Sequence, residues 1–226
     1  MATIMNREGV LSLARKLIEK NPGNLLSSEN YLLHLSDSYD IAGETVEKSI
    51  SKYPKLKHRL IGEEVSLAAG LHDIGRPLRK DQLFHELRGA RYIEENGLGV
   101  NVTNSLTDVH RIAQMFRPHY VVAEQFNAEE NKEERVEFEP LGSRLLIPRT
   151  WQEQIVTYSE VNNTSLDEKI RDMKKRYLTP EYNKTDPSLY RAIVKGEKRL
   201  QEINKRIQRL TQGKLSEEEI MRYGFL

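Results

Sequence analysis

The chain has no cysteine and only one tryptophan among its 226 residues. The lack of cysteine excludes disulfide bonds, thiol nucleophiles, cysteine-ligated zinc and iron–sulfur clusters. A chain without disulfide bonds fits a reducing compartment. We therefore expect a cytoplasmic protein whose chemistry, if it has any, depends on histidine, carboxylate and basic side chains.

Long hydrophobic runs are also absent. No segment approaches the ~18 consecutive apolar residues that a membrane-spanning helix needs. The first ten residues contain Arg7 and Glu8 without an apolar core, which argues against a secretory signal. The 35 Lys and Arg residues nearly cancel the 34 Asp and Glu residues. This balance gives no reason to expect nucleic acid or a membrane as a partner.

Apolar residues recur every three or four positions through most of the chain, so we predict an all-α fold. The predicted helices cover residues 10–21, 28–53, 55–75, 81–97 and 103–118. The expected caps of the second and fourth are Ser28 and Asp81. Residues 120–149 are rich in glutamate and contain Pro140 and Pro148. There we expect a long surface insertion with a short hairpin at residues 135–138.

Three start signals indicate that helices resume after the insertion. Residues 150–153 (Thr-Trp-Gln-Glu) and 165–168 (Ser-Leu-Asp-Glu) form capping boxes, and Asp186 precedes a proline suited to a first helical position. The stripe that follows predicts a helix from Leu189 to Leu210. We divide the chain into a helical domain, residues 1–165, and a C-terminal extension, residues 166–226. The long helix is expected to pack on the domain or to form a homo-oligomer with a second copy.

The most informative segment is the run Leu-His-Asp-Ile-Gly at residues 71–75. A His72-Asp73 pair at the end of an apolar helix is unusual, because burying an isolated carboxylate is costly. A bound metal ion would neutralise that carboxylate. The alternative is a histidine that caps the helix C-terminus beside a solvated aspartate, and the dipeptide alone favours this alternative.

Further histidines at predicted helix ends change that balance. His34, His85 and His119 all lie next to small residues or helix breaks. Nitrogen and carboxylate ligands without sulfur suit Mn, Fe, Ni, Zn or Mg. His58 lies among basic residues and is expected at the surface. His110 lies half a turn out of phase with His119 on a continuous helix, so we select His119 for the site.

These residues resemble the signature of the HD-domain phosphohydrolase superfamily over roughly residues 28–165. The resemblance implies a helical bundle with a metal site at His34, His72 and Asp73. Glu160, in the phrase Tyr-Ser-Glu, replaces the distant aspartate of that family. The step His-x-x-x-Gly-Ala at residues 85–90 matches another family motif. His85 and His119 correspond to positions that hold a second metal in some members.

The resemblance further implies a hydrolase with one or two divalent metal ions. The expected substrate is a nucleotide or another small phosphorylated metabolite, attacked by a metal-bound water. Asp73 and Arg76 would be catalytic, and Arg76, Lys80 and Arg117 would bind the phosphate. Arg88 is expected to face solvent. Two alternatives stay open: a di-iron oxygenase on the same fold, and a non-catalytic nucleotide-binding module, which the replacement at Glu160 supports.

Overall fold

The structure is a computed structural model of the chain. It describes residues 5–25, 27–80, 84–98, 106–118, 123, 126–127, 132–141, 143–161, 168, 171, 175, 179–180 and 187–224. Within these ranges every regular element is an α-helix or a 3-10 helix (η), and none is a strand. The predicted all-α class is therefore confirmed.

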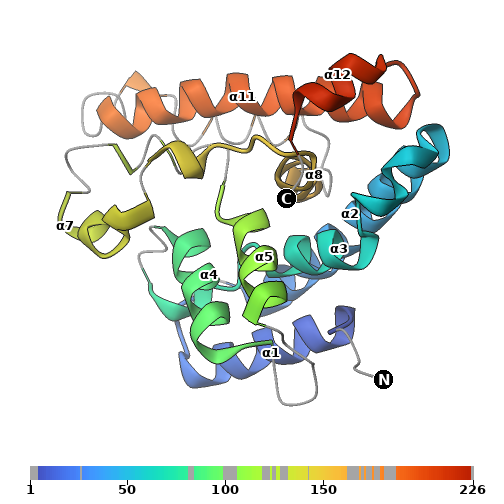
Figure 1. Cartoon of the computed structure of the whole chain (residues 1–226). Helices are drawn as coiled ribbons and strands as arrows, with labels where there is room; N and C mark the ends of the chain where they lie inside the picture. The colour runs from blue at the N-terminus through green and yellow to red at the C-terminus, as the bar shows by residue number, and fades with distance from the viewer. Residues whose placement is uncertain are drawn as a thin grey trace.

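The helices follow one another with short connections where the chain is described (Figure 1). Their bounds, in chain order, are α1 (Arg7–Lys20), α2 (Ser28–Lys52), η1 (Pro54–His58), α3 (Gly62–Leu71), η2 (Arg76–Leu78), α4 (His85–Asn96), α5 (Leu106–Phe116), α7 (Lys132–Arg135), η4 (Val136–Leu141), η5 (Ser143–Leu146), α8 (Trp151–Val161), α11 (Pro187–Thr211) and α12 (Glu217–Arg222).

Helix starts differ from the predictions by a few residues. The cap of α2 is Ser27 rather than Ser28, and its hydroxyl accepts a hydrogen bond from the Asn30 N–H at 3.3 Å. This bond satisfies a donor that the first helical turn leaves without a partner. Helix α4 begins at His85, after Phe84 in the left-handed region at φ 54°. The predicted cap Asp81 lies outside the described residues.

The predicted continuous helix over residues 55–75 is wrong, because η1 and α3 are separate elements. Leu56 and Leu60 are both buried and lie one helical turn apart. A continued helix would place Glu63 and Glu64 on that apolar face, whereas Val65 is the next buried apolar residue. The apolar pattern slips by one residue between Leu60 and Val65, so the helix must break to keep both sets of side chains in the core.

The predicted hairpin at residues 135–138 is also wrong, since this segment is helical in α7 and η4. The region is not simply a solvated insertion either. Its apolar residues form a second, smaller core against the start of α4, in which the Phe84 ring lies 6.1 Å from Phe126 and 6.0 Å from Phe138. A few large apolar residues therefore outweigh the many glutamates that suggested a surface loop.

The main core is built where α2, α3 and α8 pack on one another, with α5 packed on α3 and α8. Helix α11 crosses over α8 and reaches α2 (Figure 1). It starts at Pro187, the predicted first position, and buries Ile203, Ile207 and Leu210 in the same core. The long helix packs on this helical core through its apolar stripe.

The capping box predicted at the start of α8 is confirmed. The Glu153 N–H donates to the Thr150 hydroxyl at 3.3 Å, and the Thr150 N–H donates to the Glu153 carboxylate at 2.8 Å. The capping box predicted at residues 165–168 begins outside the described residues. Another box, Ser216 with Glu219, starts α12 and was not predicted, although its Ser-x-x-Glu signal is in the sequence. The Trp151 indole N–H donates to the Ile220 carbonyl at 2.8 Å and holds α12 against α8.

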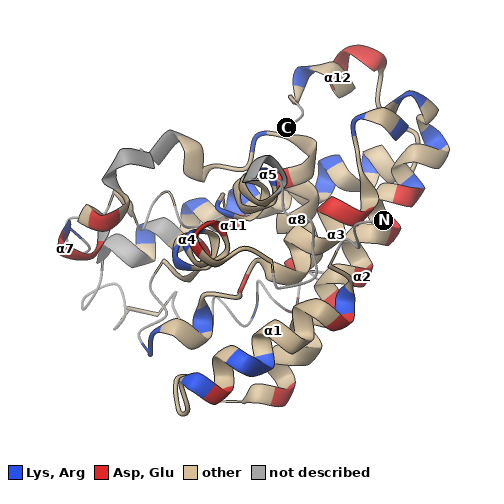
Figure 2. Cartoon of the chain, turned by 60° about the horizontal axis from the view of Figure 1, so that its bottom comes forward, with Lys and Arg blue, Asp and Glu red and all other residues tan. Residues whose placement is uncertain are grey.

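Charged residues of both signs are interspersed along α1 and other outer helices (Figure 2). This arrangement agrees with the near-neutral composition of the chain. In the part of the chain that the structure describes, no helix combines the length and apolar character needed to cross a membrane.

Candidate metal centre

The His-Asp pair lies in the turns that follow α3, directly after its most apolar stretch. Every residue from Val65 to Leu71 is buried, and α3 ends at Leu71. His72 and Asp73 continue the chain in tight turns, with 2% and 1% of their surfaces exposed. His72 keeps helical backbone angles as the C-cap of α3, and its Nε2 lies 3.5 Å from Oδ2 of the following Asp73.

Two glycines bring α4 against these turns. A Cβ atom on Gly75 would lie 2.0 Å from the His85 carbonyl oxygen and 2.6 Å from the Gly89 nitrogen. Real Cβ atoms do not approach backbone so closely, so only glycine fits at this position. Gly89 makes the reciprocal approach, with its own Cβ position 2.9 Å from the Gly75 nitrogen. This contact sets His85 beside Asp73.

Three ligand atoms converge at the centre. The Nε2 atoms of His34 and His72 lie 3.1 Å apart, and Asp73 Oδ2 lies 3.4 Å from His34 Nε2 and 3.5 Å from His72 Nε2. Ligands bound ~2.0–2.2 Å from one ion lie ~3 Å apart in octahedral and ~3.4 Å apart in tetrahedral geometry. The three atoms therefore have the spacing that a single metal ion requires.

The protonation of His72 suits a metal ligand. Its Nδ1 lies 2.6 Å from the Ala69 carbonyl oxygen, which can only accept, so Nδ1 carries the hydrogen. Nε2 then presents its lone pair to the centre, and a carbonyl partner of this kind fixes the ring as metal-bound histidines require. Burial lowers the pKa of His72 to about 4, so the ring is neutral at pH 7.

Asp73 supplies the buried negative charge. Burial alone would raise its pKa, but Arg76, His72 and His85 outweigh burial and hold the pKa well below its usual range. Arg76 Nε lies 2.6 Å from Oδ2, and His85 Nε2 lies 2.8 Å from Oδ1. Both contacts are short ion pairs that favour the ionised carboxylate. A buried, ionised carboxylate beside two imidazole nitrogens fits a bound cation.

Arg76 links the centre to solvent. Its side chain is 33% exposed and lines a cavity of about 240 Å³ together with Tyr31, His34 and Asp73. Leu25, Ser27 and Asn30 complete the lining from the start of α2. A small anion entering this cavity would meet the guanidinium beside the candidate metal ligands.

His85 lies between two buried carboxylates. Its Nε2 lies 2.8 Å from Asp73 Oδ1 and 3.4 Å from Glu86 Oε1. Burial alone would lower the pKa of His85, but Glu86 and Asp73 outweigh burial and raise it. His119, its predicted companion at a second metal, lies outside the described residues.

Glu160 lies on α8 with 4% of its surface exposed, so it is a buried acid rather than a solvated one. Burial lowers the pKa of His72 overall, and the negative charge of Glu160 opposes that shift in part, as it also favours the charged form of Arg76; the carboxylate therefore lies near the centre. The His34–His72–Asp73 group is the set whose ligand atoms lie together among the described residues. Ligation by Glu160 stays a prediction.

The other predicted phosphate-binding residues lie apart from these contacts. Lys80 is exposed after η2. Arg117 forms an ion pair through Nη2 with Glu94 of α4, and His110 Nδ1 lies 2.5 Å from the same carboxylate. His110 is exposed and pairs with Gln114, as its predicted helix face implies. The roles of Lys80 and Arg117 stay predictions.

Three residues near the site were missed or misjudged. Arg88 was expected to face solvent, yet it is 7% exposed, and Glu86 beside it on α4 is 1% exposed. Glu86 shares the helix face of the buried Ala90, one turn away. Tyr31 is 7% exposed, and its hydroxyl donates to the Asp73 carbonyl at 3.0 Å. It lies one turn before the buried Leu35, so helical spacing could have revealed both Glu86 and Tyr31.

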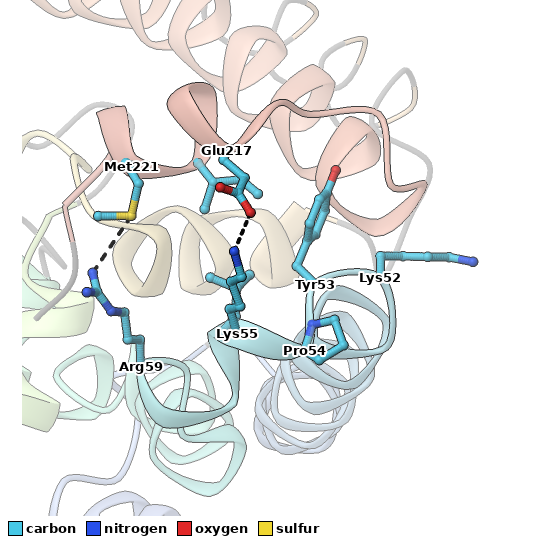
Figure 3. Close-up of a pocket in the computed structure, with 9 residues that line it drawn as sticks. Lys52, Tyr53, Pro54, Lys55, Arg59, Glu217 and Met221 are labelled. Atoms are coloured by element: carbon cyan, nitrogen blue, oxygen red, sulfur yellow. Dashed lines mark hydrogen bonds and ion pairs between the residues drawn. The ribbon is translucent and has the colours of Figure 1, made fainter.

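A larger cavity of about 430 Å³ lies between η1 and α12 (Figure 3). Two of its charged groups pair with each other, because Lys55 Nζ lies 2.5 Å from Glu217 Oε1, and Arg59 points to the Met221 sulfur (Figure 3). No histidine lines it. The cavity beside His34 and Asp73 is therefore the better candidate for chemistry among the described residues.

Comparison of the chain with protein-family models, with curated proteins and with solved structures found no match.

Proposed function

We propose that the chain is a metal-dependent hydrolase of a phosphate ester, acting on a nucleotide or a related small phosphorylated metabolite. The convergence of His34 Nε2, His72 Nε2 and Asp73 Oδ2 within 3.5 Å carries the proposal. The arrangement agrees with the resemblance of these residues to the HD-domain phosphohydrolases. It is also the arrangement that divalent ions with nitrogen and oxygen ligands favour.

Each residue has a distinct role in the proposed site. His34, His72 and Asp73 would hold the ion, and Glu160 would add a second carboxylate from α8. When bound, a divalent ion would supply Lewis acidity toward a phosphoryl oxygen and would lower the pKa of a neighbouring water. His85 would help to orient Asp73, whose Oδ1 it contacts at 2.8 Å.

Arg76 would bind and orient the substrate phosphate. Its guanidinium is positively charged at all relevant pH values and presents several donors toward phosphoryl oxygens. The contact of its Nε with Asp73 Oδ2 at 2.6 Å holds the guanidinium in place, while one third of the side chain stays accessible at the cavity. The cavity of about 240 Å³ suits a small ester better than a macromolecule.

Metal analysis of the purified protein, combined with a panel of phosphate esters, tests this proposal. We expect a bound or bindable divalent ion and metal-dependent release of phosphate from at least one ester. His72→Ala should lose both properties, whereas His58→Ala, an exposed histidine on η1, should keep them. Iron content with oxygen consumption would favour the oxygenase instead. Nucleotide binding without turnover would favour the non-catalytic module.

A further inference from the structure

A buried tyrosine connects two of the elements that carry the metal ligands. Tyr31 belongs to the second turn of α2, and its hydroxyl donates to the Asp73 carbonyl at 3.0 Å. The two residues are 42 positions apart in the sequence. His34 follows Tyr31 by one helical turn and therefore lies on the same face of α2. The tyrosine thus spans from the helix of one ligand to the backbone of another.

The carbonyl that receives this bond is part of the His-Asp turn. The same Asp73 oxygen accepts from the Arg76 N–H at 2.9 Å, which closes the turn. A carbonyl oxygen has two lone pairs, so Tyr31 and Arg76 together engage its full accepting capacity. This fixes the orientation of the Asp73 peptide, and with it the direction from which the carboxylate approaches the two histidines.

We propose that Tyr31 is a positioning residue for the metal centre, which sets the distance between His34 on α2 and the His72–Asp73 turn. This inference rests on the proposed metal-dependent function. Tyr31 holds Asp73 through its backbone and leaves both carboxylate oxygens available for the ion. Without the hydroxyl, the turn keeps its internal Arg76 bond but loses its tie to α2. The three ligand atoms, now within 3.5 Å of one another, would then vary more in spacing.

The same helix offers a matched control at its other end. The Tyr53 hydroxyl donates to the Leu215 carbonyl at 3.0 Å and accepts from the Leu215 N–H at 2.7 Å. Tyr53→Phe therefore removes two long-range hydrogen bonds of one tyrosine, as Tyr31→Phe removes one. Both changes keep the aromatic ring. Only Tyr31 touches the turn that carries metal ligands.

The experiment compares wild type, Tyr31→Phe and Tyr53→Phe in direct binding of Mn²⁺ and Co²⁺, measured by calorimetry and chelator competition. We expect Tyr31→Phe to bind roughly tenfold more weakly or worse, as is typical when a partner that orients a metal ligand is lost. Tyr53→Phe should bind like wild type. The visible spectrum of bound Co²⁺ should change in Tyr31→Phe alone, because that spectrum reports ligand geometry.

Thermal unfolding separates positioning from general stabilisation. Both variants should melt below wild type without metal, but the rise in melting temperature on adding metal should shrink only in Tyr31→Phe. Equal metal affinity and equal Co²⁺ spectra in Tyr31→Phe and wild type would overturn the role of Tyr31 while leaving the metal centre intact. Equal losses in both variants would also overturn it. A wild type that binds neither ion would refute the proposed function and this inference together.

Discussion

The molecule contains two clusters made from the same three kinds of side chain, a histidine, a carboxylate and an arginine. In one, Asp73 lies between His34, His72 and Arg76 and is 1% exposed. In the other, Glu94 lies between His110 and Arg117, and the side chains are 26%, 56% and 13% exposed. The residue types are alike, and the surroundings differ.

The difference lies in burial and in how each carboxylate is engaged. Glu94 has one imidazole and one guanidinium near solvent, where charges are screened and ion pairs contribute little. At Asp73, two imidazole nitrogens converge with one oxygen in a buried site, and His72 keeps a neutral, outward lone pair. Residue type alone therefore does not identify a candidate metal centre. The candidate is identified by the burial of the side chains, the tautomer of the histidine and the convergence of the lone pairs.

Removing one histidine from each cluster tests whether only the cluster around Asp73 binds metal. We expect His72→Ala to weaken divalent metal binding by more than about a hundredfold, because losing a residue that merely orients a ligand already costs roughly 10- to 100-fold. His110→Ala should bind metal like wild type. Far-UV circular dichroism should show the helical fold in both variants. Metal affinity retained in His72→Ala would remove the basis of the site.

A backbone change tests whether the buried cluster depends on the approach of α4. Gly75→Ala would place a Cβ 2.0 Å from the His85 carbonyl oxygen, so the turn and α4 must separate. We expect a loss of about 3 kcal/mol in the free energy of unfolding. Gly62→Ala is the control, because its Cβ would meet only Val46 at an ordinary 3.7 Å. Denaturant melts of the two variants measure the difference, and equal stability would contradict the close approach.

Much of the fold could be predicted from local signals. Caps and stop signals are short-range, which is why the box at Thr150 and the end of α4 at Gly97 were placed correctly. The errors had two origins. The break after Leu60 is marked by a one-residue slip in the apolar pattern, which the prediction of one continuous helix overlooked. The helical turns near Phe138 depend on Phe84, more than fifty residues away, and that contact leaves no periodic trace in one segment.

The candidate site likewise contains residues that the sequence could identify and residues that only the structure reveals. His34, His72 and Asp73 could be selected because several histidines lie near predicted helix breaks and because these residues resemble the signature of the HD-domain phosphohydrolases. Helical spacing could have shown that Tyr31 is buried, but no residue pattern encodes the bond from its hydroxyl to the Asp73 carbonyl. Arg117 was chosen for its charge and its place before His119. Its pairing with Glu94 depends on how α4 and α5 pack, which only the three-dimensional structure supplies.

Substitutions of Glu160 test whether the metal site includes a ligand from α8. If it ligates, Glu160→Ala should weaken metal binding and hydrolysis together by roughly tenfold or more, since the site loses a charge and an oxygen donor. Glu160→Asp should keep metal binding or strengthen it, because it restores the aspartate of the resembling family. Glu94→Ala removes an acid from the other cluster and serves as the control. Unchanged metal stoichiometry and hydrolysis in Glu160→Ala would refute ligation.

The smallest change in stability is expected for substitutions in the cluster of Glu94, His110 and Arg117. Arg117→Ala and Glu94→Ala should each lower the free energy of unfolding by about 1 kcal/mol or less, as is usual for ion pairs near the surface. A double-mutant cycle isolates the coupling between the two residues. We expect this coupling to shrink between 0.05 and 0.5 M salt, because charges that are partly exposed are still screened. Metal affinity should stay at the wild-type value in both variants. A metal affinity or phosphate release that falls strongly in Arg117→Ala, with stability unchanged, would instead return Arg117 to substrate binding and show that its pair with Glu94 opens during function.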